Sequence, residues 1–213
     1  MSVVGKITSL RWWLGLKPKF PEKEMNLSVA VVIPAYNEER CIADTINSLK
    51  SQTAHIDEIV VVDDCSSDRT SEIARSMGVK VVRTPKNQGT KAMAQNYVLQ
   101  KLKYDLIVTI DADTLLAPDA IERVLPYFNN EKTFAVCGFV VPQKIETTWE
   151  RGRHVEYVFG ITILKAGQNN TGLVMVASGC FTVFRYDVLK ELGFFNERTM
   201  AEDMDLTWEA LFR

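Results

Sequence analysis

Two aspartates separated by one residue, Asp111 and Asp113, directly follow a run of apolar, mostly β-branched residues at 106–110. Such a run is typical of a buried parallel strand, and open α/β sheets bind ligands just beyond the carboxyl ends of their strands. Side chains two residues apart in a strand point to the same face, so these carboxylates would repel each other unless a cation lay beside them. Mg²⁺ and Mn²⁺ prefer such oxygen ligands, and Mg²⁺ commonly links carboxylates to phosphates. We therefore predict a metal–diphosphate site at this pair; two solvated aspartates that open a turn are the alternative.

The strands that would position this pair are predicted from the first 130 residues, where four apolar runs each precede a stretch with helical spacing of apolar residues. The runs lie at 27–34, 58–64, 79–82 and 106–110. Strict alternation of strands and helices predicts a parallel sheet with right-handed crossovers. The predicted fold class is therefore α/β, with a mainly parallel sheet flanked by helices. Ser66 or Ser67 is expected to cap the second helix, which should end at Met77-Gly78.

Polar residues follow three of these strands, which would place them together on one edge of the sheet. The three groups are Tyr36-Asn37, Asp63-Asp64 and Asp111-Asp113. Such clustering is what a nucleotide pocket needs. The sequence has no G-x-G-x-x-G after the first strand and no G-x-x-x-x-G-K-[ST] loop, which argues against a dehydrogenase and a P-loop protein. Phosphate charge would instead be met by a metal ion and by Lys86 or Lys91.

The second half of the chain has a different character. A strand is expected at 134–141, a helix at 150–165 and a last helix near Met200. Small residues around Gly179 interrupt two apolar runs, and a glycine there would let a ligand approach the backbone closely. Glu202 and Asp203 fall at the start of the last helix. The helix dipole favours acids there, so helix stabilisation is the alternative to a catalytic role.

Composition and charge narrow the possible partners. The chain has 213 residues, of which 46% are apolar and 24% charged, and its net charge of −2 argues against nucleic-acid binding. Its four cysteines form no C-x-x-C pair and only two histidines are present, so we expect reduced cysteines in a cytoplasmic protein and no zinc site. The longest charge-free run, residues 166–184, is too polar to span a bilayer.

The first twenty residues carry four cations and no acid, so the remainder of the chain carries −6. The apolar residues of this segment recur at helical spacing beside Trp12 and Trp13. These features are typical of a helix that lies in a membrane interface, and a helix docked on the domain itself is the alternative. Residues 1–26 are therefore predicted to be a basic amphipathic segment and linker. Residues 1–16 could then hold the protein at the cytoplasmic face of a membrane.

Six motifs in sequence order carry a resemblance to a known family. They are Val31–Glu39, Val61–Asp68, Asn87-x-Gly89-x-Lys91, Asp111-Ala112-Asp113, Ser178-Gly179 with the later Arg185, and Glu202-Asp203. In this order they resemble the motifs of the family 2 inverting glycosyltransferases, which have the GT-A fold, from about Leu27 to the C-terminus. The sequence is most similar to synthases that polymerise β-linked N-acetylglucosamine, and more distantly to hyaluronan, chitin and cellulose synthases.

The resemblance implies a role for each matched residue. Asp203, with Glu202, would carry the catalytic base, and Asp111 and Asp113 would bind Mg²⁺ or Mn²⁺. The UDP-sugar would be bound by Pro34, Tyr36, Asn37, Glu38, Asp63, Asp64, Asn87, Gly89, Lys91, Asp111, Ala112, Asp113, Ser178 and Gly179. Residues 27–130 would form the nucleotide-binding half and 131–213 the acceptor half of one domain. Two departures from the family pattern are Ala201, where the base motif usually has threonine, and the lack of a Q-x-x-R-W motif and membrane helices before Arg213, so a C-terminally truncated catalytic portion is expected.

One base without an enzyme nucleophile indicates single displacement, so an α-linked donor would give a β-linked product. The acceptor would be a carbohydrate or a lipid-linked hydroxyl group. Three alternatives stay open: a sugar-nucleotide-binding module without turnover, a lipid-phosphate glycosyltransferase, and a sugar-nucleotide pyrophosphorylase. The last is the weakest, because residues 35–37 are not the glycine-rich basic loop that such an enzyme would need after its first strand.

Overall fold

The computed structural model describes residues 26–165, 167–168, 173–199 and 201–212. The amphipathic segment predicted for residues 1–16 lies outside this part of the chain. The described residues fall into two compact units, one within 21–138 and 177–213 and one within 139–176. Each unit is described by itself below. None of the described helices is long and apolar enough to cross a bilayer.

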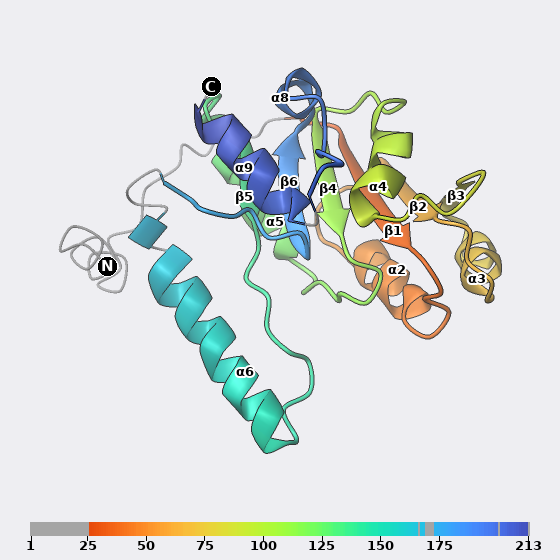
Figure 1. The fold of residues 1–213 in the computed structure, drawn as a ribbon, viewed down its shortest axis with the longest axis horizontal. Helices are drawn as coiled ribbons and strands as arrows, with labels where there is room; N and C mark the ends of the chain where they lie inside the picture. The colour runs from red at the N-terminus through yellow and green to blue at the C-terminus, as the bar shows by residue number, and fades with distance from the viewer. Residues whose placement is uncertain (1–25, 166, 169–172, 200, 213) are drawn as a thin grey trace. The chain divides into compact units, whose positions relative to one another are not determined.

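The first unit is built on a mixed sheet of six strands in the order β3-β2-β1-β4-β6-β5 within the described chain (Figure 1). In sequence order the strands are β1 (Val29–Ala35), β2 (Glu58–Asp63), β3 (Lys80–Arg83), β4 (Leu106–Ile110), β5 (Ala135–Cys137) and β6 (Phe181–Arg185). The four strands β3, β2, β1 and β4 are parallel, as the strand–helix alternation predicted. Strand β6 runs antiparallel to β4, and β5 antiparallel to β6. The α/β class with a mainly parallel sheet is therefore confirmed.

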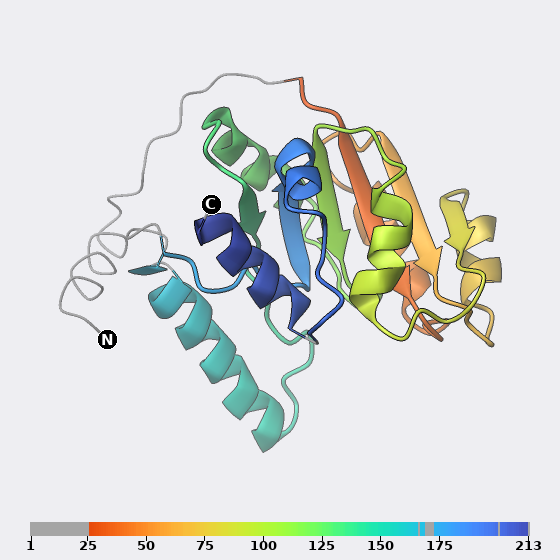
Figure 2. The ribbon, with the colours of Figure 1, turned by 45° about the horizontal axis from the view of Figure 1, so that its top comes forward.

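Helices connect and cover these strands. They are α2 (Ile42–Lys50), α3 (Thr70–Ser76), α4 (Lys91–Leu99), α5 (Ala120–Val124), the 3₁₀ turn η1 (Leu125–Asn129), α8 (Tyr186–Glu191) and α9 (Glu202–Phe212). Figure 2 shows α4 lying across β1 and β2, the strands that it contacts. Because successive side chains of a strand point to opposite faces, the almost complete burial of β1 requires cover on both faces of the sheet.

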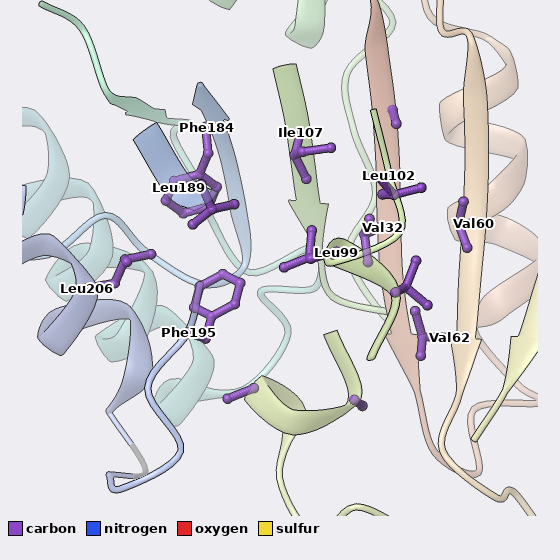
Figure 3. Close-up of a cluster of buried hydrophobic side chains, with 14 of the residues drawn as sticks. Val32, Val60, Val62, Leu99, Leu102, Ile107, Phe184, Leu189, Phe195 and Leu206 are labelled. Atoms are coloured by element: carbon purple, nitrogen blue, oxygen red, sulfur yellow. The ribbon is translucent and has the colours of Figure 1, made fainter. Parts of the chain in front are cut away.

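One hydrophobic cluster joins the sheet to α4, α8 and α9 (Figure 3). Its strand residues are Ala30, Val32, Val60, Val62, Ile107 and Phe184, and its helix residues include Leu99, Leu189 and Leu206. The rings of Phe184 and Phe195 meet edge to face at 5.8 Å between centroids, the geometry that aromatic quadrupoles favour. The cluster fixes α4 and α9 on the same face of the sheet, and the first turns of these two helices carry Lys91 and Asp203.

Several predicted boundaries were wrong. Strand β4 ends at Ile110, so Asp111 and Asp113 lie in the following turn and the same-face argument for a strand does not apply to them. Helix α3 begins at Thr70, after Ser66 and Ser67, and neither serine caps it. The strand expected at 134–141 is only three residues long.

The second unit contains α6 (Thr148–Phe159), which continues as the π-helical segment η2 (Gly160–Lys165). The sequence predicted a helix over 150–165, and the structure confirms it with an earlier start. A capping box explains that start: Thr147 accepts a hydrogen bond from the Glu150 amide at 3.2 Å, and the Glu150 carboxylate accepts one from the Thr147 amide at 2.8 Å. The backbone hydrogen bonds from Thr147 and Glu146 lower the pKa of Glu150.

Candidate active site

Strand ends bring the predicted site residues to one edge of the sheet. Pro34 pairs in register with Val62, so β1 and β2 end side by side. Strand β6 is antiparallel to β4, and its first residue, Phe181, pairs with Ile110 at the end of β4. The segment that precedes β6 therefore lies at the same edge as the turn that follows β4. Because β6 runs antiparallel to β4, Ser178-Gly179 lies beside the turn formed by Asp111, Ala112 and Asp113, which we call the D-x-D turn.

Four side chains and backbone groups form a continuous chain of contacts at this edge. The Lys91 ammonium forms an ion pair with the Asp111 carboxylate and donates a hydrogen bond to the Gly179 carbonyl oxygen at 2.8 Å. The Gly179 amide donates in turn to Asp203 Oδ2 at 3.1 Å. Lys91 is the first residue of α4, and Thr90 caps that helix by accepting from the Met93 amide. The metal-binding and base candidates thus meet around one residue, Gly179.

Two side chains approach the backbone closely at Gly179. A Cβ atom built there would lie 3.3 Å from Lys91 Nζ and 3.6 Å from Asp203 Oδ2. The sequence predicted that a glycine here lets a ligand approach the backbone closely, and that stays a prediction. The approaching groups are side chains of the protein itself.

The loop before β6 and the start of α9 are held together by Thr207, a residue that the sequence analysis did not single out. Its hydroxyl donates to the Asp203 carbonyl oxygen at 2.6 Å and accepts from the Ala177 amide at 2.9 Å. Thr182 donates to the Ser178 carbonyl oxygen at 2.6 Å. A threonine four residues after the base candidate was the available signal, since such residues bond back to the preceding helical turn.

The turn after β4 carries an excess of negative charge. Burial and the nearby carboxylates of Asp113, Asp68 and Asp111 raise the pKa of Glu38. Asp113 is exposed, and its carboxylate accepts no hydrogen bond from the described residues. The turn itself is fixed, because Thr45 Oγ1 donates to the Ala112 carbonyl oxygen at 2.7 Å.

These residues fit a divalent cation of the Mg²⁺ type. Carboxylate oxygens are its preferred ligands, and local negative charge favours it. The described residues contain no preformed group of three or more metal-ligating side chains. Asp111 and Asp113 would therefore supply only part of the coordination shell, which is the usual situation when substrate phosphates supply the rest.

Asp63, at the end of β2, forms hydrogen bonds and an ion pair within the protein. It is completely buried, and Oδ1 accepts from the Ser66 amide at 2.9 Å. Oδ2 accepts from the Ser71 hydroxyl and, at 2.5 Å, from Arg83 Nη1. Burial alone would raise the pKa of Asp63, but the serine hydrogen bonds and the Arg83 charge lower it overall. Both oxygens are thus engaged by the protein, which leaves Asp63 a supporting position beside the predicted uridine pocket.

Asp64 and the 87–89 segment form the adjoining wall. Asp64 is buried, and its carboxylate accepts from the Thr84 hydroxyl at 2.8 Å and the Gln88 amide at 2.9 Å. Asn87 donates to the Asp64 carbonyl oxygen at 3.2 Å and accepts from the Gly89 amide at 2.8 Å. Gly89 has a φ of +84°, which explains the glycine of the third motif.

The loop after β1 contacts the segment that follows β2. Asn37 adopts a φ of +58°, and its side-chain oxygen accepts from the Ser67 amide at 2.8 Å. The Glu38 amide donates to Thr70 Oγ1 at 2.8 Å. Tyr36 remains 53% exposed, so its ring is free to cover a ligand. The predicted residues of the first two motifs therefore lie together.

Two predicted residues stand apart from these contacts. Glu202 is half-buried at the start of α9, and its carboxylate makes no hydrogen bond to the described residues. Arg185 pairs with Leu106, at the far end of β6 from Gly179. It donates to the carbonyl oxygens of Phe128 at 2.9 Å and Thr133 at 3.2 Å. Arg185 therefore lies apart from Ser178-Gly179, although the two were assigned to one motif.

Comparison with known proteins decides the family. The profile described as Glycosyl transferase family 2 matches residues 30–193. This chain belongs to that family. It is 29% identical over 186 residues to a poly-beta-1,6-N-acetyl-D-glucosamine synthase from Staphylococcus epidermidis, covering 85% of this chain and 45% of the relative. It is 31% identical over 182 residues to a hyaluronan synthase from Streptococcus pyogenes, covering 80% and 43%. The chain thus spans less than half the length of these two curated relatives.

Solved structures confirm the GT-A fold. The mannosyltransferase PcManGT from Pyrobaculum calidifontis, solved with GDP-Man and Mn²⁺, matches with a TM-score of 0.73 and 21% identity, covering 95% of this chain and 58% of that chain. Glucosyl-3-phosphoglycerate synthase from Mycobacterium tuberculosis, solved with Mn²⁺, UDP-glucose and glycerol 3-phosphate, matches with a TM-score of 0.63 and 22% identity, covering 88% and 66%.

Proposed function

We propose that this chain transfers N-acetylglucosamine from its UDP-sugar to an acceptor hydroxyl group and forms a β-linkage. The family and the names of the relatives support the reaction class and the choice of sugar. The observation that carries the proposal is the contact chain from Asp111 through Lys91 and Gly179 to Asp203. These contacts join Asp111 and Asp203 through one residue, Gly179, which supports a leaving-group site and a base close to each other.

Asp203 is proposed as the general base. Its Oδ2 accepts only the Gly179 amide among the described residues, so one lone pair remains for an acceptor hydroxyl proton. As the proton moves to Asp203, the acceptor oxygen bonds to the anomeric carbon and the bond from that carbon to the diphosphate oxygen breaks. One displacement inverts the anomeric configuration, so an α-linked donor gives a β-linked product. Such base catalysis typically contributes about 10²–10⁴-fold to the rate.

The diphosphate charge is proposed to be met at the D-x-D turn. A divalent cation held by Asp111 and Asp113 would neutralise the charge that develops on the leaving UDP. Lys91 provides a further positive charge at this edge. Tyr36, Asn37 and Asp64 would hold the nucleoside, and Asp63 would support the turn that follows β2.

The acceptor is proposed to be a carbohydrate or a lipid-linked hydroxyl group. We also propose that residues 1–16 bring the chain to an anionic bilayer, since they hold two basic residues and two tryptophans, and Lys17 and Lys19 follow directly. Each basic residue near such a surface contributes about 1 kcal/mol. Sedimentation with anionic vesicles should therefore decrease when residues 1–16 are deleted, and equal binding by both forms would contradict this.

A transfer assay on the purified chain tests the proposed reaction. UDP-GlcNAc, UDP-glucose and GDP-mannose would be offered in turn with β-linked N-acetylglucosamine oligosaccharides, with Mn²⁺ or with excess chelator. We expect transfer from a UDP-sugar only when the cation is present, a β-anomeric product by NMR, and loss of transfer in Asp113→Asn. Full activity in chelator contradicts the metal role, and an α-linked product contradicts the single displacement. Metal-dependent donor binding without transfer or hydrolysis would support the binding-module alternative.

A further inference from the structure

We propose that Lys91 is an exchangeable counter-ion for Asp111, so that the protein binds a divalent cation strongly only when the donor diphosphate is present to receive the lysine ammonium. This inference rests on the proposed function, because it assumes that the D-x-D turn holds a cation and a nucleotide diphosphate. It adds that Lys91 makes the binding of the two ligands interdependent.

The first observation is that Lys91 engages the carboxylate that a cation would need. Its ammonium pairs with Asp111 Oδ1, and the two side chains are 29% and 30% exposed. Partial burial strengthens such a pair relative to one in open water, because solvent and salt screen it less. With Asp111 neutralised in this way, Asp113 is the only carboxylate of the turn that lacks a positively charged partner among the described residues. A cation arriving alone would meet one free carboxylate of the turn, that of Asp113, with Glu38 nearby and the Lys91 ammonium on Asp111.

The second observation is that the ammonium can leave without unfolding the site. The backbone of Lys91 is held in the first turn of α4, which Thr90 caps. The other partner of the Lys91 ammonium is the neutral carbonyl oxygen of Gly179. The amide of Gly179 is bonded to Asp203, so Gly179 keeps a partner when the ammonium leaves. Lysine carries a compact charge on a flexible four-carbon stem, so the charge can move several ångströms while the helix stays in place.

The third step concerns charge balance when the donor binds. A diphosphate brings negative oxygens that can accept the Lys91 ammonium, and its arrival frees Asp111 Oδ1 for the cation. Each ligand therefore removes an obstacle to the other. By linkage, the nucleotide raises the affinity for the cation by the same factor as the cation raises the affinity for the nucleotide.

Lys91→Met tests the exchange, with Lys80→Met as the matched control. Lys80 forms an ion pair with Glu58 at 2.9 Å, at the opposite end of β2 from the site. Both substitutions remove one positive charge and one ion pair. Mn²⁺ binding would be measured without nucleotide from the electron paramagnetic resonance signal of free Mn²⁺. UDP binding would be measured by calorimetry with Mn²⁺ and with chelator.

We expect Lys91→Met to bind Mn²⁺ alone roughly 5- to 150-fold more tightly than the parent chain, the usual range for coupling between two sites. It should bind UDP more weakly in chelator, and Mn²⁺ should then improve its UDP binding by a smaller factor than in the parent. Lys80→Met should match the parent in all three measurements. Thermal unfolding would verify folding, and Lys91→Gln provides a second variant that retains a polar end group.

Two different failures can be told apart. If the parent binds Mn²⁺ with UDP but Lys91→Met gains no Mn²⁺ affinity over Lys80→Met, Lys91 is only a structural support for Gly179 and the exchange is wrong, while the proposed function stands. If no variant binds Mn²⁺ with or without UDP, both the exchange and the metal role in the proposed function are wrong.

A double variant tests where the Mn²⁺ binds. Asp113→Asn in the Lys91→Met background should abolish the gain in Mn²⁺ affinity. A gain that persists there would place the Mn²⁺ elsewhere and overturn the exchange.

Discussion

Asp63 ends β2 and Asp111 directly follows β4, the two strands that flank β1, yet the surroundings of the two carboxylates differ. Asp63 is completely buried and accepts hydrogen bonds from Ser66, Ser71 and Arg83. Asp111 is partly exposed, and its carboxylate is paired with one flexible lysine. Asp63, buried and bonded to an arginine and two serines, supports the fold. A carboxylate that is held by a single movable cation, beside the unpaired Asp113, remains available for a ligand.

The largest effect is expected at Asp203, the proposed base, whose carboxylate accepts hydrogen bonds only from the amides of Gly179 and Met204 among the described residues. Asp203→Asn keeps the size of the side chain and the hydrogen bond from the Gly179 amide, but removes the proton-accepting group. Turnover should fall by about 10²-fold or more, the scale of a general base, while UDP-sugar affinity stays unchanged. Asp205→Asn is the control. Asp205 lies on the same helix as Asp203, and its carboxylate is paired with Arg198. Steady-state transfer rates and calorimetric donor titrations measure both quantities, and equal losses in the two variants would remove the assigned role.

The next effect concerns stability. Asp63→Ala leaves Arg83 and two serines without their buried partner. The free energy of unfolding should fall by about 3 kcal/mol, at the low end for breaking a buried pair because the Arg83 side chain is 43% exposed. Asp111→Ala should change it by less than about 1 kcal/mol, as expected for a partly exposed ion pair. Urea denaturation of the two variants measures the difference. Similar losses in both would show that the two carboxylates do not differ as described.

The pH dependence of stability should report Asp63 as well. Its pKa is lower in the folded protein than the ordinary value of about 3.9, so its contribution is fully present above that pH. The contribution should be lost as the pH falls from about 4 through the folded pKa. The urea midpoint of Asp63→Asn should therefore depend less steeply on pH below 4 than that of the parent. Parallel curves would indicate that Asp63 has the same pKa in both states.

The smallest effect is expected at Gly179. An alanine methyl group would meet Lys91 Nζ at 3.3 Å and Asp203 Oδ2 at 3.6 Å, and both are ends of movable side chains. Gly179→Ala should therefore fold with the stability of the parent but transfer sugar roughly 10-fold more slowly, since small displacements of reacting groups lower rates by 10²-fold or less. Gly152→Ala, where a Cβ would meet nothing within 4 Å, is the control for a glycine substitution. An unchanged transfer rate would show that the contacts around Gly179 do not position the site.

The parallel part of the sheet could be predicted from the sequence because strand–helix alternation leaves few topologies open. The antiparallel return of β6 beside β4 could not, since a short apolar run does not reveal its partner or its direction. The site residues were predicted as motifs, but their partners were not. Asp63 with Arg83, and Asp111 with Lys91, are pairs twenty residues apart that only the packed sheet brings together. Sequence therefore indicated which carboxylates gather at this edge, and structure showed which of them the fold already uses.

The most direct test of this difference is calorimetric titration of UDP into the parent chain with Mn²⁺ and with excess chelator, repeated on Asp113→Asn. We expect Mn²⁺ to tighten UDP binding by at least about 5-fold in the parent, within the usual range of coupling between sites. Mn²⁺ should have no effect on UDP binding in Asp113→Asn at an unchanged unfolding temperature. If Mn²⁺ leaves the UDP affinity of the parent unchanged, the carboxylates of the D-x-D turn do not serve a metal-bound diphosphate, and the account given for this edge of the sheet is wrong.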